Sequence, residues 1–178
     1  MKKLTSLLLI GSLFFQTGSL TAQNAETDSL LNRHFTIWKQ KLMNGAYTEY
    51  YQFQAYEFFI RAKLKLPNAT ASASDMVETL NDMRIQSVDF KVISRLYQSD
   101  NAEYYTGYEV LKLDAGIFGA GEFEAPIIFI RSPNAPSWKF FYLNEATLPH
   151  LKKVLPNAPK EMIIPEEKGT VMSDQSWK

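Results

Sequence analysis

The apolar periodicity of this chain changes once, near residue 86, and that change limits the possible folds more than any other feature. Before it, apolar residues recur at the three- and four-residue spacing of helices. After it, they alternate with polar residues, as in strands with one face in a core. Because the connections between these strands are short, antiparallel neighbours are favoured. Helices followed by an antiparallel sheet predict an α+β domain in which the helices cover the sheet.

Three helices are predicted in the first half of the chain. The apolar stripe of the first includes Phe35 and Trp38, and the Asn44-Gly45 pair provides a stop. The second is rich in aromatic residues and ends before Pro67. Their predicted ranges are Asp28 to Asn44, Tyr47 to Leu66 and Ser74 to Met83.

Four strands are predicted in the second half, joined as an antiparallel meander in a curved sheet. A helical turn from Ala146 to Leu155 and an extended tail from Pro156 follow. The predicted strands are Gln86 to Tyr97, Glu103 to Leu113, Glu122 to Arg131 and Ser137 to Leu143.

The first 22 residues have the layout of a secretory signal peptide. Lys2 and Lys3 precede an apolar run from Leu4 to Phe15, and a small, polar region leads to a predicted cut at Ala22–Gln23. The run is about a dozen residues, shorter than the roughly 20 of a membrane-spanning helix. We therefore expect an exported protein, periplasmic or secreted. The predicted organisation is a signal peptide (1–22), a single α+β domain (23–155) and an extended C-terminal tail (156–178).

Composition narrows the classes of partner and chemistry. Removal of Lys2 and Lys3 from the 19 basic residues leaves 17 against 19 acidic ones, a net charge of −2. A nucleic-acid partner is not expected, since no basic excess remains. The chain has no cysteine, which excludes thiol catalysis, cysteine-ligated metal and a lipid anchor on a cleavage-site cysteine. No stable membrane anchor is expected.

The order of elements resembles the NTF2-like branch of the cystatin-like folds. Phe35 and Trp38 on the first helix, the long strands and the Trp138-Lys139-Phe140 triplet carry the resemblance, which extends from Asp28 to Leu143. It implies helices packed into the concave face of a bent four-stranded sheet. The second predicted helix is longer than is usual in that family, and its early short strand is not identified here. Because the family contains enzymes, ligand binders and interaction modules, the resemblance implies no activity.

Two residues are candidates for acid–base chemistry. His34 lies on the apolar stripe of the first helix, and Asp89 lies on the first strand. An imidazole next to a fixed carboxylate would suit proton transfer, whereas a hydrogen-bonded core histidine is the simpler interpretation. The other histidine, His150, is 116 residues away from His34, and neither has a ligand at metal-binding spacing, so no metal site and no cofactor is predicted.

The tyrosines are the best candidates for ligand contact. Tyrosine joins a large apolar ring to a hydroxyl that seeks a partner when buried, and several such rings around one cavity would suit a small amphipathic ligand. The alternative is that they divide between core and surface. The candidate binding residues are Tyr51, Tyr105, Tyr108 and Trp138.

Two local motifs suggest contact or modification. Ile117 and Phe118 lie at the tip of a glycine-containing loop that lacks the Gly-Lys-Ser/Thr ending of a phosphate loop; they could contact a partner or fold back over the sheet. Asp28-Ser29-Leu30 resembles a short O-glycosylation acceptor of some exported bacterial proteins, but it also serves as a helix cap.

The leading hypothesis is an exported binding or interaction module that holds an amphipathic small molecule or a protein surface between helices and sheet. A pocket enzyme that uses His34 or Asp89 in proton transfer is the alternative. A third possibility is a structural or inhibitory role through the Ile117–Phe118 loop and the tail. A homodimer formed through the sheet is also compatible with the pattern.

Overall fold

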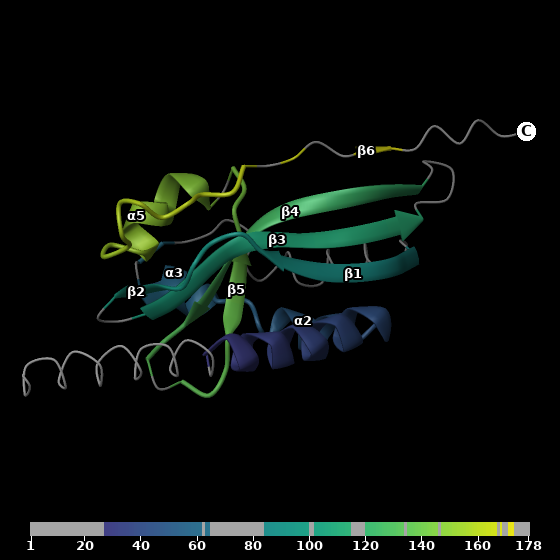
Figure 1. The fold of residues 1–178 in the computed structure, drawn as a ribbon, viewed down its shortest axis with the longest axis horizontal. Helices are drawn as coiled ribbons and strands as arrows, with labels where there is room; N and C mark the ends of the chain where they lie inside the picture. Colours follow the sequence, from purple (N-terminus) through teal and green to yellow (C-terminus); the bar gives the residue numbers. More distant parts are fainter. Residues whose placement is uncertain are drawn as a thin grey trace, which may run out of the picture.

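The computed structural model describes residues 27–61, 63–64, 84–99, 102–114, 120–133, 135–145, 147–166, 168 and 171–172. The fold is α+β, an open antiparallel sheet with helices packed against it (Figure 1). The predicted signal peptide, the predicted third helix and the Ile117–Phe118 tip lie outside the described residues.

The sheet has the order β1-β3-β4-β5, which is the predicted four-strand meander. Two short strands extend it: β2 pairs with β3, and β6 pairs with β4 at Gly121 and Glu122. All paired strands are antiparallel. Their bounds are β1 Arg84–Val92, β2 Tyr97–Ser99, β3 Ala102–Asp114, β4 Ala120–Arg131, β5 Lys139–Tyr142 and β6 Val171–Met172.

The predicted first strand, Gln86 to Tyr97, is interrupted after Val92. The Ile93 amide still donates to the Thr106 carbonyl at 2.9 Å, and the Thr106 amide donates to Ser94 Oγ at 2.9 Å; regular strand pairing resumes at β2. Gly107 lies at the close approach of β1 and β3, where an added Cβ would stand 1.9 Å from the Lys91 carbonyl oxygen. The glycine is therefore required by the geometry of the two strands.

The N-terminal helix is described from residue 27 to residue 43, in agreement with the predicted Asp28–Asn44 helix. The predicted helix from Tyr47 to Leu66 is wrong as a single element, because it divides into α2 (Tyr47–Tyr51) and α3 (Tyr56–Arg61). Between them the chain pairs with β5: Ala55 N donates to Phe140 O at 2.7 Å, and Phe140 N donates to Phe53 O at 3.0 Å. These tertiary hydrogen bonds replace those of a continuous helix. At the C-terminal side, η2 (Leu148–His150) and α5 (Leu151–Val154) form the predicted helical turn.

Helices cover both faces of the sheet, whereas the sequence predicted cover on one face. The N-terminal helix and α2 pack on one face, and α3 and α5 pack on the other (Figure 1). The two covers explain why nine consecutive residues of β3, from 102 to 110, are all buried. We call the face toward the N-terminal helix the inner face and the opposite one the outer face.

Candidate functional site

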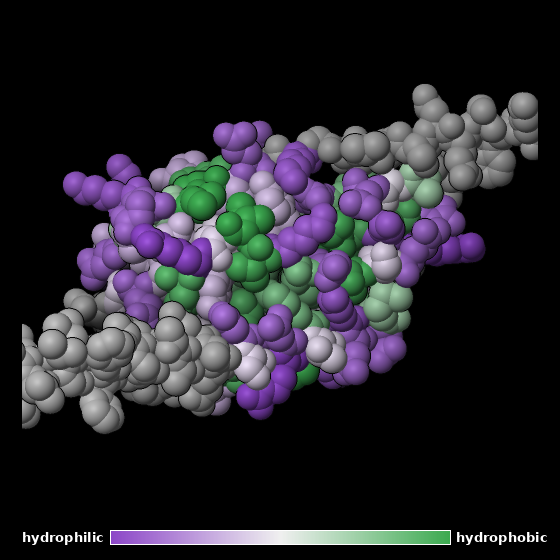
Figure 2. Space-filling view, viewed as in Figure 1, coloured by the Kyte–Doolittle hydropathy of each residue, from purple (hydrophilic) through white to green (hydrophobic). Residues whose placement is uncertain are grey.

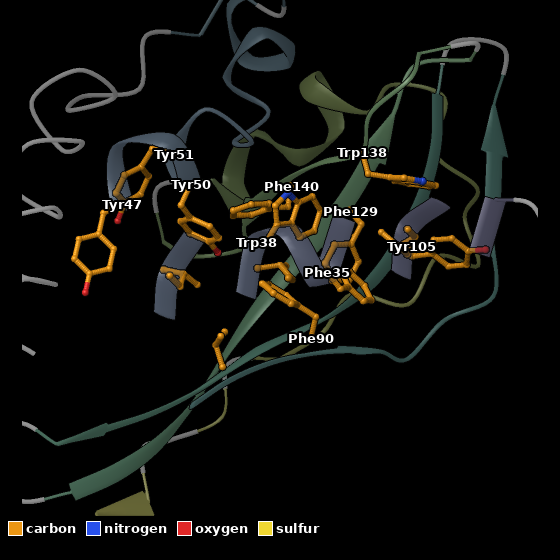
Figure 3. Close-up of a cluster of buried hydrophobic side chains, with 14 residues drawn as sticks. Phe35, Trp38, Tyr47, Tyr50, Tyr51, Phe90, Tyr105, Phe129, Trp138 and Phe140 are labelled. Carbon is orange, nitrogen blue, oxygen red and sulfur yellow. The ribbon is translucent and has the colours of Figure 1, made fainter. Parts of the chain in front are cut away.

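A continuous layer of aromatic side chains lies between the N-terminal helix, α2 and the inner face (Figure 3). Its rings are in contact: the centroids of Phe35 and Phe129 are 4.9 Å apart, and those of Trp38 and Phe140 are 5.0 Å apart. Tyr47 lies at one end of the layer and Tyr105 at the other (Figure 3). The members of this aromatic layer are Phe35, Trp38, Tyr47, Tyr50, Tyr51, Phe90, Tyr105, Phe129, Trp138 and Phe140.

One carboxyl group is buried within this layer. Glu109 on β3 is only 2% exposed. Tyr50 on α2 donates its hydroxyl to Glu109 Oε1 at 2.5 Å, and Tyr142 on β5 donates to Oε2 at 2.7 Å. The two hydroxyl oxygens are 3.2 Å apart. Three elements therefore meet at one polar point, which we call the Glu109 cluster (Glu109, Tyr50 and Tyr142).

Burial sets the protonation behaviour of the cluster. It raises the pKa of the Glu109 carboxyl, and the hydrogen bonds from the two tyrosines offset part of that rise. Burial, together with the nearby Glu109 carboxyl, raises the pKa of Tyr50 and of Tyr142 well above the ordinary value. Both phenols thus keep their protons, and Glu109 is the member of the cluster that gains or loses one.

The layer also contains hydrogen-bond donors without a protein acceptor. Trp38 Nε1 and Trp138 Nε1 are buried, and neither has a hydrogen-bond partner among the described residues. Trp38 lies next to Phe140, which also contacts Tyr50 at 5.1 Å between ring centroids. Buried polar atoms normally have a partner, so these two indole N–H groups stand out as unsatisfied donors within the described part of the layer.

A second polar group closes the far end of the layer. Arg131 Nε donates to Glu103 Oε2 at 2.8 Å, and the guanidinium lies 5.2 Å from the ring centroid of Trp138. Tyr105 donates to Asp28 at the start of the described helix. Both side chains of the Glu103–Arg131 pair are mostly buried and bond to each other. We therefore interpret this group as a structural contact between β3 and β4, and not as a binding site.

The structure separates the tyrosine and tryptophan candidates into three places. Tyr105 and Trp138 are in contact, with ring centroids 5.6 Å apart. Tyr51 lies at the opposite end of the layer, where its ring centroid is 5.9 Å from that of Tyr50 (Figure 3). Tyr108 faces the outer side and donates its hydroxyl to the Glu166 carbonyl at 3.2 Å. The four residues do not converge on one ligand position.

The acid–base candidates also have separate partners. His34 is 6% exposed, and its Nδ1 donates to the Leu30 carbonyl at 2.9 Å within the same helix. Asp89 pairs with Lys39 at 2.6 Å, and the hydrogen bond from Lys39 lowers the pKa of Asp89. No contact joins His34 to Asp89 in the described part of the chain. Ser29, the residue of the acceptor-like motif, is exposed on the N-terminal helix.

Sequence reasoning missed Glu109, although a signal was present. In β3, the residues at 105, 107, 109, 111 and 113 share the inner face. Glu109 is therefore an acidic residue on this face between Gly107 and the partly buried Leu111. The outer face of β3 is buried as well, at Tyr104, Tyr108 and Val110. The strand therefore lacks the alternation of apolar and polar residues that would have marked Glu109 as unusual.

No protein-family model, no curated protein and no solved structure matches this chain. The described residues contain no group of three or more potential metal ligands. None of the described helices is both long enough and apolar enough to cross a membrane.

Proposed function

We propose that this protein is a small binding module that holds an amphipathic ligand between its helices and the inner face of the sheet. The polar end of the ligand would meet the Glu109 cluster, and its apolar part would lie against the aromatic layer. The observation that carries the proposal is the burial of an ionisable carboxyl, 2% exposed, inside an otherwise aromatic layer.

Stability alone is a poor reason to keep such a group. Desolvation of a carboxyl costs several kcal/mol, and well-packed apolar residues at buried charged positions are often equally or more stabilising. Buried carboxyls with a raised pKa are more typical of functional sites. The unpartnered indole of Trp38 supports the same conclusion, because it leaves a second polar position in the layer.

The element that would open to admit a ligand is α2. It has five residues, its N-cap Ala46 makes no side-chain capping bond, and Gly45 precedes it with a φ of 70°. An ion pair between Lys41 and Glu49 holds it to the N-terminal helix. Because α2 supplies Tyr50, an outward movement of this short helix would uncover the Glu109 cluster.

The test uses amphiphiles that differ only in their head group. An alkyl amine, an alcohol and a carboxylate of equal chain length are titrated below their micelle concentrations and followed by calorimetry. At a pH above the folded pKa of Glu109, we expect the amine and the alcohol to bind, and the carboxylate to bind least because its negative charge repels that of Glu109. Glu109→Gln should remove the difference between amine and carboxylate, whereas Glu122→Gln, at a half-exposed position on β4, should keep it. Equal, weak binding of all three amphiphiles would reject the proposal.

A proton-transfer enzyme is a second candidate, favoured by the raised pKa of Glu109. Glu109 would act as general acid or base, and the two phenols would donate to a developing negative oxygen on the substrate. This assignment differs from the sequence-based alternative, which used His34 or Asp89. NMR detection of solvent-deuterium exchange into a bound ligand separates the candidates: an enzyme exchanges an acidic C–H of the ligand, and a binding module does not.

The fold relationship and the location are also proposals. The N-terminal helix, the long antiparallel strands and the aromatic inner face support an NTF2-like domain, and an experimental structure would test it. The sequence of residues 1–22 supports export to the periplasm or the medium. Mass spectrometry of the mature N-terminus after expression in a bacterium would test the cut at Ala22–Gln23.

A further inference from the structure

The outer face of the sheet carries the C-terminal segment, of which the structure describes residues 159–166, 168 and 171–172. After a turn at Lys160 and Glu161, its described residues run as an extended chain (Figure 1). Helix α5 precedes this segment, and β6 ends it by pairing with β4. Figure 2 shows apolar side chains gathered on this side of the molecule, where α5 and the segment lie. The exposed apolar residues there include Ile163 at 49% and Ile164 at 38%.

Two tyrosines of the sheet bind this segment through its backbone. The Tyr97 hydroxyl donates to the Glu161 carbonyl at 3.3 Å and accepts from the Ile163 amide at 3.0 Å. The Tyr108 hydroxyl donates to the Glu166 carbonyl at 3.2 Å. These three hydrogen bonds involve no side chain of the segment, so any extended chain in the same position could make them.

From Met162 to Lys168, the described side chains of the segment that contact the protein recur every three residues; before them, Glu161 pairs with Arg95 at 3.3 Å. Met162 packs against the outer core, Pro165 is buried, and Lys168 lies with its ammonium 4.4 Å from the ring centroid of Tyr108. The two residues between Met162 and Pro165 point to solvent. A three-residue period is that of a polyproline II chain, whereas a strand would have a period of two.

The outer face carries a negative charge next to Lys168, the third of the three contacting residues. Lys168 bonds to Glu124 on β4, which also accepts from Lys91 at 2.8 Å. Both lysines lower the pKa of the Glu124 carboxyl, so it is a carboxylate at neutral pH. Recognition of peptides often uses aromatic side chains that contact an extended backbone, together with a nearby carboxylate that pairs with a basic residue of the peptide.

We propose that the outer face from Tyr97 to Glu124 is a docking surface for an extended segment of another protein chain. The segment carries an apolar residue, a proline and a basic residue at successive three-residue spacings. The protein's own C-terminal segment has this pattern and occupies the surface in competition with the partner. The proposal goes beyond ligand binding on the inner face and depends on neither Glu109 nor α2.

The experiment uses the full chain with a protease recognition sequence inserted at the exposed Pro156-Asn157 and cut after folding. A trace amount of a fluorescein-labelled peptide of residues 159–172 is titrated with the protein, and binding is followed by fluorescence polarisation. After the cut, the freed segment no longer competes intramolecularly, so we expect the cut chain to bind the peptide at least about tenfold more tightly than the uncut chain.

Modified peptides and variants test which groups are recognised. N-methylation of the Ile163 amide should weaken binding about fivefold, since one hydrogen bond is lost, and Tyr108→Phe should do the same. Replacement of Ile163 and Ile164 by serine in the peptide should leave the affinity unchanged. Tyr47→Phe on α2 is the matched control in the protein and should bind the peptide as the unaltered chain does.

Three results would overturn the docking surface: no uptake of the peptide by the cut chain, unchanged affinity after N-methylation, or unchanged affinity in Tyr108→Phe. A dimer of the uncut chain that the peptide dissociates would support the surface and identify its occupant as the segment of a second copy. Since Tyr108 and the Glu109 cluster lie on opposite faces, failure here leaves the amphiphile test of the inner face unaffected.

Discussion

Replacement of Glu109 by glutamine should change how the stability of this protein depends on pH. Burial raises the pKa of Glu109 in the folded protein above its ordinary value of 4.5. Glu109 thus has a lower pKa in the unfolded chain and a higher pKa in the folded protein. At pH values between the two, the unfolded chain has lost the proton and the folded chain still holds it. The contribution of Glu109 to stability is therefore fully present at pH values below 4.5 and is lost as the pH rises through the folded pKa.

The size of the effect follows from the number of protons involved. One proton changes the free energy of unfolding by at most about 1.4 kcal/mol per pH unit within this window. Glutamine has a similar shape and no titratable proton, so the variant lacks this contribution to the pH dependence of the free energy of unfolding. The stability of the unaltered protein should thus fall relative to Glu109→Gln as the pH rises, and the difference should level off above the folded pKa.

Urea unfolding at a series of pH values, followed by tryptophan fluorescence, gives this difference directly. Glu122→Gln provides a matched control for the exchange of a glutamate for a glutamine, because its carboxyl is partly exposed and pairs with Lys112 at 3.4 Å. A pH-independent difference between the unaltered protein and Glu109→Gln would refute the burial argument. A difference of opposite sign would show that the two phenols stabilise the carboxylate more than burial destabilises it.

Three further substitutions test the packing around the site by chemical unfolding. Tyr142→Phe removes a donor to Glu109, so it should cost about 1 kcal/mol and extend the pH window upward, because a bond that lowers the Glu109 pKa is gone. Gly107→Ala places a methyl group against a strand backbone and should cost about 3 kcal/mol; a neutral effect would contradict the close approach of β1 and β3. Glu103→Gln alone should lower the free energy of unfolding by about 3 kcal/mol, because Arg131 stays buried without its partner. The double variant Glu103→Gln with Arg131→Met should lose less. If the losses of the two single variants add up in the double variant, the buried pair is contradicted.

The regular elements of this fold are encoded locally, so sequence patterns could predict them. The apolar stripe that contains Phe35 and Trp38 predicts the N-terminal helix to within about one residue at its C-terminal end. Strand-like apolar and aromatic runs bounded by loop residues predict β3 and β4, and the short connection between them predicts their antiparallel pairing. In these segments the local pattern and the tertiary contacts favour the same structure.

Prediction failed where tertiary contacts override the local pattern. Residues 52–55 contain no glycine or proline to mark a helix break, yet their backbone pairs with β5 at Phe140. The same limit hid the Glu109 cluster, because Tyr50 and Tyr142 meet Glu109 from positions 59 and 33 residues away along the chain. No local spacing relates these three residues. The Tyr97 and Tyr108 contacts with the C-terminal segment were missed for the same reason.

The central claim, that a ligand binds between the helices and the inner face at Glu109, is tested most directly by NMR shift mapping. The protein is labelled with ¹⁵N and titrated with the alkyl amine, and amide shifts are followed residue by residue. The structure predicts that the largest changes occur at Tyr50, Tyr51, Glu109 and Tyr142 and that Glu109→Gln reduces them. Shifts confined to outer-face residues such as Tyr97, or no shifts at all, would contradict the claim.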